Sequence, residues 1–266
     1  MVSAVDWSQG HPALQTFWLS SHRKCAMGIE TNLRLLQHKR LRDFGEKSGE
    51  SERSRRLADM IKRLFDLGCS AIGLVILAPV LVLLAIWIKL EDGGPILYSG
   101  TRVGRFGRPF QMLKFRTMVV NAERLGGPST ADHDPRITRC GRFLRKRKLD
   151  EVPQLINVLR GEMSIVGPRP EVPFYVNLFS DEEKAILSVR PGITDWASLW
   201  NSDEGAVLHG SADPERAYME RIRPEKIRLQ LAYVRNRSFL VDLGIIARTV
   251  LMVLAKRRPQ GLHAAH

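Results

Sequence analysis

The chain has 266 residues, and its 41 Lys and Arg against 28 Asp and Glu give a formal net charge of +13. Apolar residues make up 44% and charged residues 26%, values typical of a globular protein that argue against disorder along the whole chain. Three cysteines, Cys25, Cys69 and Cys140, lie far apart and exclude both a disulfide scaffold and a zinc site of the usual spacing. The positive charge indicates an anionic partner: nucleic acid, an anionic membrane or a phosphorylated small molecule.

The first 56 residues are polar and mixed in charge, and they end in a charged stretch that is typical of a linker. They lack the basic start and apolar run of a signal peptide. We therefore expect a variable, loosely ordered N-terminal extension over residues 1–56.

The next segment, expected as a membrane helix over 57–91, contains 22 uncharged residues from Leu67 to Ile88. An uncharged apolar run of about 18 residues is already long enough to indicate a membrane helix. Pro79 lies near its middle, where proline removes a hydrogen bond and kinks a helix. Basic residues flank both ends, so the residues alone leave two arrangements open: a kinked transmembrane helix, or a re-entrant helix with both ends in the cytoplasm.

From residue 92 the chain is predicted to form a cytosolic catalytic domain over 92–258, followed by a tail over 259–266. Short apolar runs at Pro95–Tyr98 and Phe110–Met118 surround a Gly- and Arg-rich turn and predict a small hairpin.

Apolar residues at i, i+3, i+4 and i+7 from Val152 predict an amphipathic helix to Arg160. Gly161 is placed to end it, and Asp150 is a natural N-cap.

Farther on, Pro214–Arg237 predicts a charged helix that is interrupted near Pro224. Phe239–Ala255 predicts a buried or interfacial amphipathic helix. Together these elements predict an α+β fold: a membrane helix, a small α/β catalytic part and interfacial amphipathic helices.

Between Arg102 and Lys148 lie 13 Lys or Arg residues, opposed by only Glu123, Asp132 and Asp134. Such a run repels itself unless anions fill it, and phosphate groups are the anions that arginine and lysine bind best. The alternative is a solvated face that contacts anionic lipid headgroups.

Asp150 and Glu151 follow this cationic run directly. A carboxylate at a helix N-terminus beside cations stays ionised, which suits a nucleophile toward phosphorus or a ligand for magnesium. The alternative for Asp150 is a simple N-cap. Neighbouring residues in a helix point in different directions, so the pair can act together only at a helix end. Farther along, two prolines fix the backbone on both sides of Arg169.

Five motifs occur in an order that is highly specific, although each is only moderately specific alone. Together they closely resemble the bacterial sugar transferase family, the monotopic phosphoglycosyl transferases of polyprenol phosphate, over about residues 60–256. The motifs are Lys62–Asp66, Lys114–Met118, Leu149–Gln154, Gly161–Pro170 and Arg190–Thr194.

The resemblance implies an enzyme that transfers a sugar 1-phosphate from a UDP-sugar to undecaprenyl phosphate and releases UMP. It implies Mg²⁺ as cofactor and the first membrane step of exopolysaccharide, O-antigen, capsule or glycoprotein glycan assembly. It places the protein in the bacterial inner membrane, among its lipids, with the catalytic part in the cytoplasm and downstream glycosyltransferases as partners. By the same resemblance the membrane helix is re-entrant and turns at Pro79.

The resemblance also assigns roles to individual residues. Asp150 attacks the β-phosphorus and forms a phosphosugar-aspartyl intermediate, and Glu151 supports the magnesium or accepts a proton. Asp150 and Glu151 are therefore both the catalytic and the metal-binding candidates. Arg145 and Arg169 match family cations near the phosphates, and Lys114 and Arg116 match another basic motif of the family. These four residues are the phosphate- or substrate-binding candidates.

Three positions depart from the family pattern. Ala78 stands where many members have Ser, and Lys148 stands where a small hydroxyl residue is common. Asp195 stands where Gly is common, in a region where we expect the acceptor or the sugar to be recognised.

Two other function classes compete with this hypothesis. A non-catalytic membrane-anchored scaffold or lipid-binding protein would keep the apolar helix and basic surface, but it would tolerate Asp150→Asn. A nucleic-acid-binding protein would explain the charge, but no helix-turn-helix, RNP or zinc pattern is present, and few aromatic residues lie in the basic stretch. We therefore expect no nucleic-acid partner.

Overall fold

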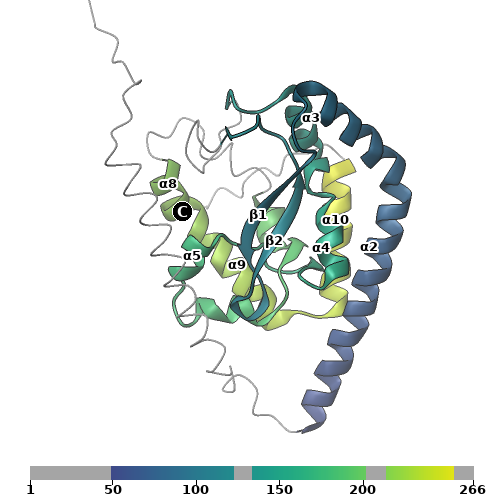
Figure 1. Cartoon of the computed structure of the whole chain (residues 1–266). Coiled ribbons are helices and arrows are strands. Elements are labelled where there is room, and N and C mark those ends of the chain that lie inside the picture. Colours follow the sequence, from purple (N-terminus) through teal and green to yellow (C-terminus); the bar gives the residue numbers. More distant parts are fainter. Residues whose placement is uncertain (1–48, 123–133, 202–213, 255–266) are drawn as a thin grey trace, which may run out of the picture.

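The computed structural model describes residues 49–122, 134–201 and 214–254 (Figure 1). Most of the expected N-terminal extension, residues 1–48, and the expected tail, 259–266, lie outside the described residues. The described part is rich in helices and has two small two-stranded sheets, in agreement with the predicted α+β class. In chain order the elements are α2 (Gly49–Asp92), β1 (Leu97–Val103), η2 (Arg105–Gly107), β2 (Pro109–Phe115), α3 (Arg139–Arg147), η4 (Leu149–Glu151), α4 (Gln154–Arg160), β3 (Ser164–Val166), α5 (Pro173–Asn177), η5 (Glu183–Ser188), β4 (Gly192–Thr194), α6 (Trp196–Trp200), α8 (Pro214–Ala217), η6 (Tyr218–Ile222), α9 (Arg223–Asn236) and α10 (Phe239–Leu254).

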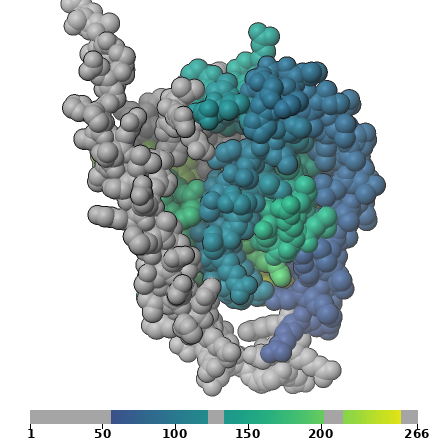
Figure 2. Space-filling model, in the orientation of Figure 1, coloured from purple at the N-terminus to yellow at the C-terminus, as the bar shows by residue number. Residues whose placement is uncertain are grey.

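Helix α2 dominates one side of the molecule and curves around it (Figures 1 and 2). Among the described residues it is the one helix long and apolar enough to cross a membrane, and only 11% of its most apolar window is buried. It begins at Gly49, earlier than the expected 57, and it passes through Pro79 without interruption. The expected break into two half-helices at Pro79 is thus not seen. Proline deletes one backbone hydrogen bond, which bends a helix without having to end it.

The predicted hairpin is confirmed. Strands β1 and β2 pair antiparallel, with Leu97 opposite Phe115 and Val103 opposite Pro109. The connection contains Phe106 and Gly107, both with positive φ. The turn places Arg105 next to η5, where its Nε donates to the carbonyl of Ser188.

Strands β3 and β4 form a second, parallel pair, with Ser164 opposite Gly192 and Val166 opposite Thr194. The two backbones approach so closely next to this pair that a Cβ on Gly192 would lie 2.1 Å from the nitrogen of Gly167. Only glycine fits there. Because a turn at Gly161 separates α4 from β3, the start of β3 lies near the C-terminal end of α4.

Helix α4 confirms the predicted helix before Gly161, which ends it with φ of +84°. The predicted N-cap is wrong: Pro153 occupies that position, no side chain caps it, and Asp150 lies in the preceding turn η4. The fully buried side chains of α4 are Gln154, Asn157 and Val158, while Leu159 is 37% exposed. The apolar stripe therefore turns toward α2 and the surface rather than toward the centre of the domain.

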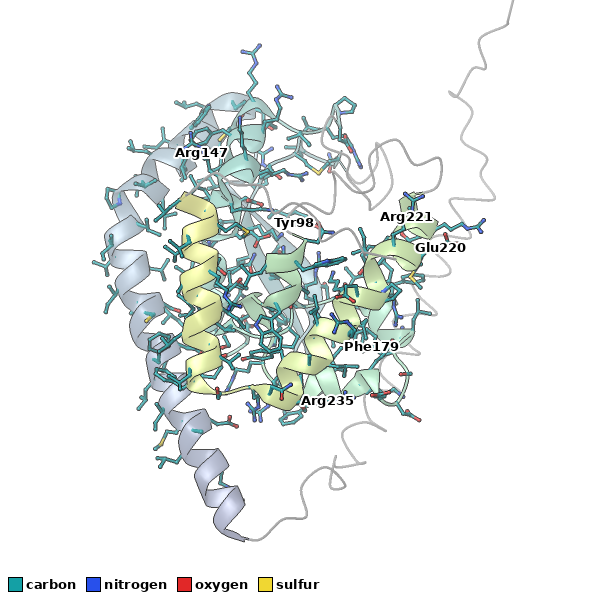
Figure 3. All side chains as sticks on the ribbon, turned by 180° about the vertical axis from the view of Figure 1, so that it is seen from behind. Tyr98, Arg147, Phe179, Glu220, Arg221 and Arg235 are labelled. Carbon is teal, nitrogen blue, oxygen red and sulfur yellow. The ribbon has the colours of Figure 1, made fainter. Side chains whose placement is uncertain are left out.

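The interruption predicted near Pro224 is a single π-helical turn, Tyr218–Ile222, which joins α8 to α9. Proline has no N–H to complete the regular helical bond, and a widened turn accommodates that loss. Helix α10 runs alongside α2, as Figure 1 and the view from behind in Figure 3 both show. Phe65 and Phe239 pack edge to face between the two helices, 5.3 Å apart.

Candidate active site

The two neighbouring carboxylates lie in a turn between two helices. Lys148 ends α3 in the left-handed conformation, with φ of 56°, and starts the 3-10 turn η4 that contains Asp150 and Glu151. The pair therefore precedes α4 instead of lying inside it, which meets the condition for joint action. Asp150 is 8% exposed, so this turn holds a carboxylate away from water.

Glu151 is held by two cations from distant parts of the chain. Lys114 at the end of β2 donates its Nζ proton to Oε1 at 3.1 Å. Arg169, in the loop after β3, donates from Nη1 to Oε2 at 3.1 Å and from Nη2 to Oε1. Burial by itself raises the pKa of Glu151, but Arg169 and Lys114 outweigh burial and hold the pKa well below its usual range. Glu151 is therefore an anion in this site.

Asp150 has the opposite surroundings. Its Oδ1 is buried and accepts no hydrogen bond from the described residues. Burial and the charge of Glu151 raise the pKa of Asp150, against the opposing effect of Lys114, Lys148 and Arg145. A buried carboxylate oxygen without a partner is costly to fold, and in a charged site this cost marks Asp150 as a candidate functional group.

Three of the four expected phosphate-binding cations lie around the dyad. Lys114 and Arg169 contact Glu151, and Arg145 lowers the pKa of Asp150 while its Nε donates to Thr117 Oγ1 at 2.9 Å.

Arg116 is placed elsewhere. Its guanidinium is buried in an ion pair with Asp92 at the end of α2, and its Nε donates to the Pro95 carbonyl at 2.6 Å. In a strand, residues two positions apart point to the same face, so a longer β2 would place Arg116 on the same face as Lys114. Because β2 ends at Phe115, Arg116 is free of this constraint and points elsewhere. The structure gives Arg116 the role of anchoring α2 to the domain.

Two further residues near the dyad have contacts that the sequence did not predict. Gln154, at the start of α4 and four residues after Asp150, is fully buried, and neither atom of its amide has a partner among the described residues. The sequence does contain a signal for Gln154, because it is a polar residue within the apolar pattern of a short helix. It marks a second group with unused hydrogen-bonding capacity near the dyad.

Asp195 is the other residue whose role emerges only in the structure. It is fully buried and accepts hydrogen bonds from the backbone nitrogens of Ser198, at 2.6 Å, and Arg169, at 3.1 Å. It caps α6 and holds the backbone of the Pro-Arg-Pro loop. The carboxylate of Asp195 is buried and bonds to backbone nitrogens, so in this structure it has a positioning role; recognition of sugar or acceptor in this region stays a prediction.

The donor set limits what kind of metal could bind here. No group of three or more His, Cys, Asp or Glu side chains suited to a metal occurs in the residues that the structure describes. Magnesium in phosphoryl-transfer sites typically takes one or two protein carboxylates and completes its shell with phosphate oxygens and water. The unpartnered Oδ1 of Asp150 beside the anionic Glu151 fits that smaller donor set.

A sequence model for bacterial sugar transferases matches residues 57–256. The chain belongs to the bacterial sugar transferase family. The match includes α2 from residue 57 onward, the dyad and all four expected cations, so the apolar part of the helix and the charged site belong to one family unit.

Several relatives of this sugar transferase have names that describe an activity. It is 36% identical over 198 residues to UDP-N-acetylgalactosamine-undecaprenyl-phosphate N-acetylgalactosaminephosphotransferase of Aeromonas hydrophila, covering 73% of this chain and 44% of that protein. It is 39% identical over 202 residues to UDP-glucose:undecaprenyl-phosphate glucose-1-phosphate transferase of Caulobacter vibrioides, covering 74% and 70%. It is 35% identical over 218 residues to exopolysaccharide production protein ExoY of Sinorhizobium fredii, covering 76% and 89%. The chain thus spans less than half of the Aeromonas relative and most of the other two.

Proposed function

We propose that this bacterial sugar transferase transfers a sugar 1-phosphate from a UDP-sugar to undecaprenyl phosphate and releases UMP. The observation that carries the proposal is the buried, unpartnered oxygen of Asp150 beside a Glu151 that two cations keep ionised. The names of the Aeromonas and Caulobacter relatives support the donor and acceptor classes. The reaction would be the first membrane step of exopolysaccharide, O-antigen, capsule or glycoprotein glycan assembly, and downstream glycosyltransferases would use its product.

The chemistry proceeds in two displacements at one phosphorus atom. Asp150 Oδ1 attacks the β-phosphorus of the UDP-sugar, a carboxyl–phosphate bond forms, and the bond to the bridging oxygen breaks so that UMP leaves. A phosphate oxygen of undecaprenyl phosphate then attacks the same phosphorus, and the Asp150 carboxylate is released unchanged. Splitting the transfer in this way replaces one difficult reaction between two anions by two easier reactions.

The cations have a defined part in this proposal. Arg169 and Lys114, which bond to Glu151, would also stabilise the negative charge that gathers on the transferred phosphoryl group. We propose that Mg²⁺ is held by Asp150 and Glu151. When bound, it would reduce the repulsion between the carboxylates and the diphosphate.

We further propose that α2 enters the bacterial inner membrane from the cytoplasm and returns to it. Lys62 near one end of α2 forms a 2.6 Å ion pair with Asp242 of α10, and Asp92 at the other end pairs with Arg116 after β2. Both ends are therefore tied to one catalytic domain, which supports placing both ends on one side of the membrane. The curve of α2 in Figure 1 and its exposed apolar side chains are consistent with a shallow, bent insertion.

The test is UMP release by detergent-purified protein with Mg²⁺, undecaprenyl phosphate and a panel of UDP-sugars. We expect one donor to give UMP, and Asp150→Asn to lower the rate at least about 10⁴-fold, as loss of a nucleophile does. Asp181→Asn is the matched control, because this carboxylate is exposed and forms an ion pair with Lys184, three residues away, and we expect its loss to leave the rate unchanged. UMP release by Asp150→Asn at the wild-type rate would refute the covalent mechanism. No UMP from any donor by folded protein would favour the scaffold hypothesis.

A further inference from the structure

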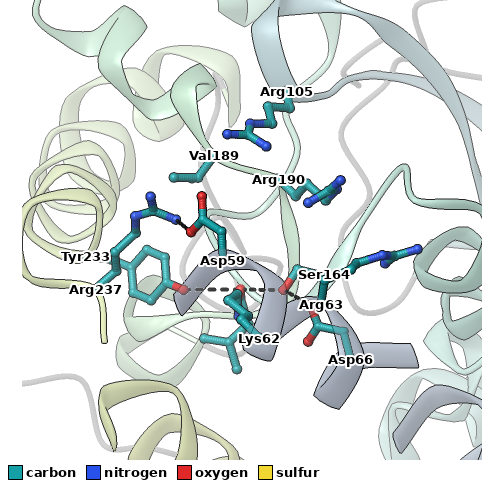
Figure 4. Close-up of a pocket in the computed structure, with 11 residues that line it drawn as sticks. Asp59, Lys62, Arg63, Asp66, Arg105, Ser164, Val189, Arg190, Tyr233 and Arg237 are labelled. Carbon is teal, nitrogen blue, oxygen red and sulfur yellow. Dashed lines mark hydrogen bonds and ion pairs between the residues drawn. The ribbon is translucent and has the colours of Figure 1, made fainter. Parts of the chain in front are cut away.

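A second charged pocket lies at the other end of α4, apart from the dyad. Figure 4 shows it between the N-terminal half of α2, the turn after β1, the residues before β4 and the end of α9. The dyad precedes the first residue of α4, whereas this pocket adjoins its last carbonyls. Its lining includes five cations: Lys62, Arg63, Arg105, Arg190 and Arg237.

Two of these five cations are neutralised within the protein. Arg237 forms a 2.9 Å ion pair with Asp59, and Lys62 pairs with Asp242 at 2.6 Å. A third carboxylate, that of Asp66, is occupied by the hydroxyl of Ser164 at 2.7 Å. The acidic side chains that line the pocket are Asp59 and Asp66. Burial lowers the pKa values of Arg63 and Arg105, and the charges of Asp66 and Asp59, respectively, oppose that shift. Within the described residues, neither carboxylate forms an ion pair with these arginines or with Arg190.

The other three arginines donate hydrogen bonds to backbone carbonyls, and Arg105 also lies over the ring of Phe106, 4.6 Å from its centroid. Arg63 donates from Nη1 to the carbonyl of Val158 at 2.7 Å, which satisfies the end of α4. Arg190 Nε donates to the Gly161 carbonyl at 3.0 Å, and Arg105 Nε donates to the Ser188 carbonyl at 2.9 Å.

These carbonyl contacts leave donors and charge unused. The Nη groups of Arg105 and Arg190 make no hydrogen bond within the part of the chain that the structure describes. Burial, followed by the charge of Arg190, lowers the pKa of Arg105, against the opposing effect of Asp59. A carbonyl satisfies a donor but does not remove a positive charge, so an anion is the group that would complete this pocket.

The size and setting of the pocket restrict the anion. The pocket is small and partly open to solvent, so it suits a single phosphate group better than a nucleotide sugar. The adjoining face of α2 exposes the apolar side chains of Leu57, Met60, Ile61 and Leu64. A phosphate group attached to acyl chains would find a cationic pocket and an apolar surface side by side.

We propose that this pocket is a second phosphate-binding site, distinct from the transfer site, and that Arg105 and Arg190 bind the phosphate of a phospholipid headgroup or free phosphate. The site anchors the N-terminal half of α2 at the membrane surface when the phosphate belongs to a lipid. This inference does not depend on the transfer reaction.

The test measures the melting temperature of the detergent-purified full chain as ligand is added. One series uses inorganic phosphate against sodium chloride at equal ionic strength, and the other uses short-chain phosphatidylglycerol against phosphatidylcholine of the same chain length. We expect the melting temperature of the wild type to rise as ligand is added. The double variant that carries both Arg105→Gln and Arg190→Gln should need at least about a tenfold higher ligand concentration for half of that rise, because two charge-assisted contacts are lost. Arg228→Gln is the matched control, because Arg228 is exposed and pairs only with Glu225 on its own helix.

The outcomes separate the sources and the sites. A half-saturating concentration at least tenfold lower for phosphatidylglycerol than for inorganic phosphate assigns a lipid headgroup, and the reverse assigns free phosphate. An unchanged response in the double variant, or a response lost in Lys114→Gln instead, overturns the proposal. If Arg190→Gln fails to fold because the Gly161 carbonyl loses its donor, the test uses Arg105→Gln alone. Its half-saturating ligand concentration is then compared with that of the wild type.

Discussion

The two ends of α4 carry opposite charge arrangements. Before its first residue lie two carboxylates, Asp150 and Glu151, and around its last carbonyls lie Arg63 and Arg190. Both arrangements agree with the helix dipole, which favours anions at the N-terminus and cations at the C-terminus. The dipole therefore explains the sign of each cluster and not its function.

The difference lies in how the charge is compensated. At the N-terminal end two cations neutralise Glu151, and Asp150 Oδ1 is the group without a partner. At the C-terminal end the unused groups are the guanidinium nitrogens of Arg105 and Arg190. The first end thus presents an anion that can attack or bind a cation, and the second presents cations that can bind an anion.

One small sheet supplies an arginine to each end. Arg169 follows the end of β3, and Arg190 precedes the start of β4, which runs parallel to β3. Parallel strands begin at the same end of a sheet. Arg169, after the end of β3, and Arg190, before the start of β4, therefore lie at opposite ends of the strands. Four predictions test this comparison between the ends of α4, beginning with the largest expected effect.

Glu151→Gln would remove the compensation at the N-terminal end and leave Lys114 and Arg169 facing each other. We expect a loss of about 3–5 kcal/mol in the free energy of unfolding, as for other broken buried ion pairs. Chemical denaturation at pH 7 measures it. Glu220→Gln is the control, because its pair with Arg216 is exposed and lies far from α2 (Figure 3), and we expect it to cost about 0–0.5 kcal/mol. Equal costs for the two variants would show that solvent screens the Glu151 pairs.

Gly192→Ala would break the sheet that separates the two arginines. The new Cβ would lie 2.1 Å from the backbone nitrogen of Gly167, and neither backbone can yield without separating β3 from β4. We expect a loss of about 1–3 kcal/mol, measured by thermal unfolding. Gly244→Ala in α10 is the control, since nothing lies within 4 Å of its new Cβ and alanine favours a helix. A Gly192→Ala protein as stable as the wild type would mean that the strands are not paired as described.

Asp150→Asn should stabilise the fold while it abolishes transfer. Burial and Glu151 raise the pKa of Asp150, so its ionisation costs stability at every pH above that raised pKa. We expect a gain of about 1 kcal/mol at pH 7, measured by thermal unfolding. The gain should disappear as the pH falls below about 4, where the carboxyl is protonated in both folded and unfolded states. A variant less stable than the wild type at pH 7 would contradict the unpartnered position of Asp150.

Lys148→Gly should have the smallest effect, and it separates backbone strain from charge. Glycine relieves the left-handed φ of 56° and should stabilise the fold by up to about 1 kcal/mol. Because Lys148 lowers the pKa of Asp150, its loss should raise that pKa further. The acidic limb of the profile of kcat/KM against pH should then move to higher pH. A limb that stays in place would show that Asp150 does not carry the essential ionisation.

Local sequence determined the elements of this protein. The hairpin, the helix that Gly161 ends, the interruption near Pro224 and the apolar character of α2 follow from periodicity and from the backbone limits of glycine and proline. The adjacent dyad and the order of the motifs also indicate the family from the sequence alone, and the family match over residues 57–256 agrees with them.

Tertiary structure alone decided which charges meet. Lys114 reaches Glu151 across 37 positions in the sequence, while Arg116, only two residues later, pairs with Asp92 instead. Asp150 is not a cap, Asp195 points inward, and Arg105 and Arg190 converge on a pocket that no local pattern marks. The physical reason is range: local preferences extend over a helical turn or one strand, whereas burial and charge pairing depend on segments that only packing brings together.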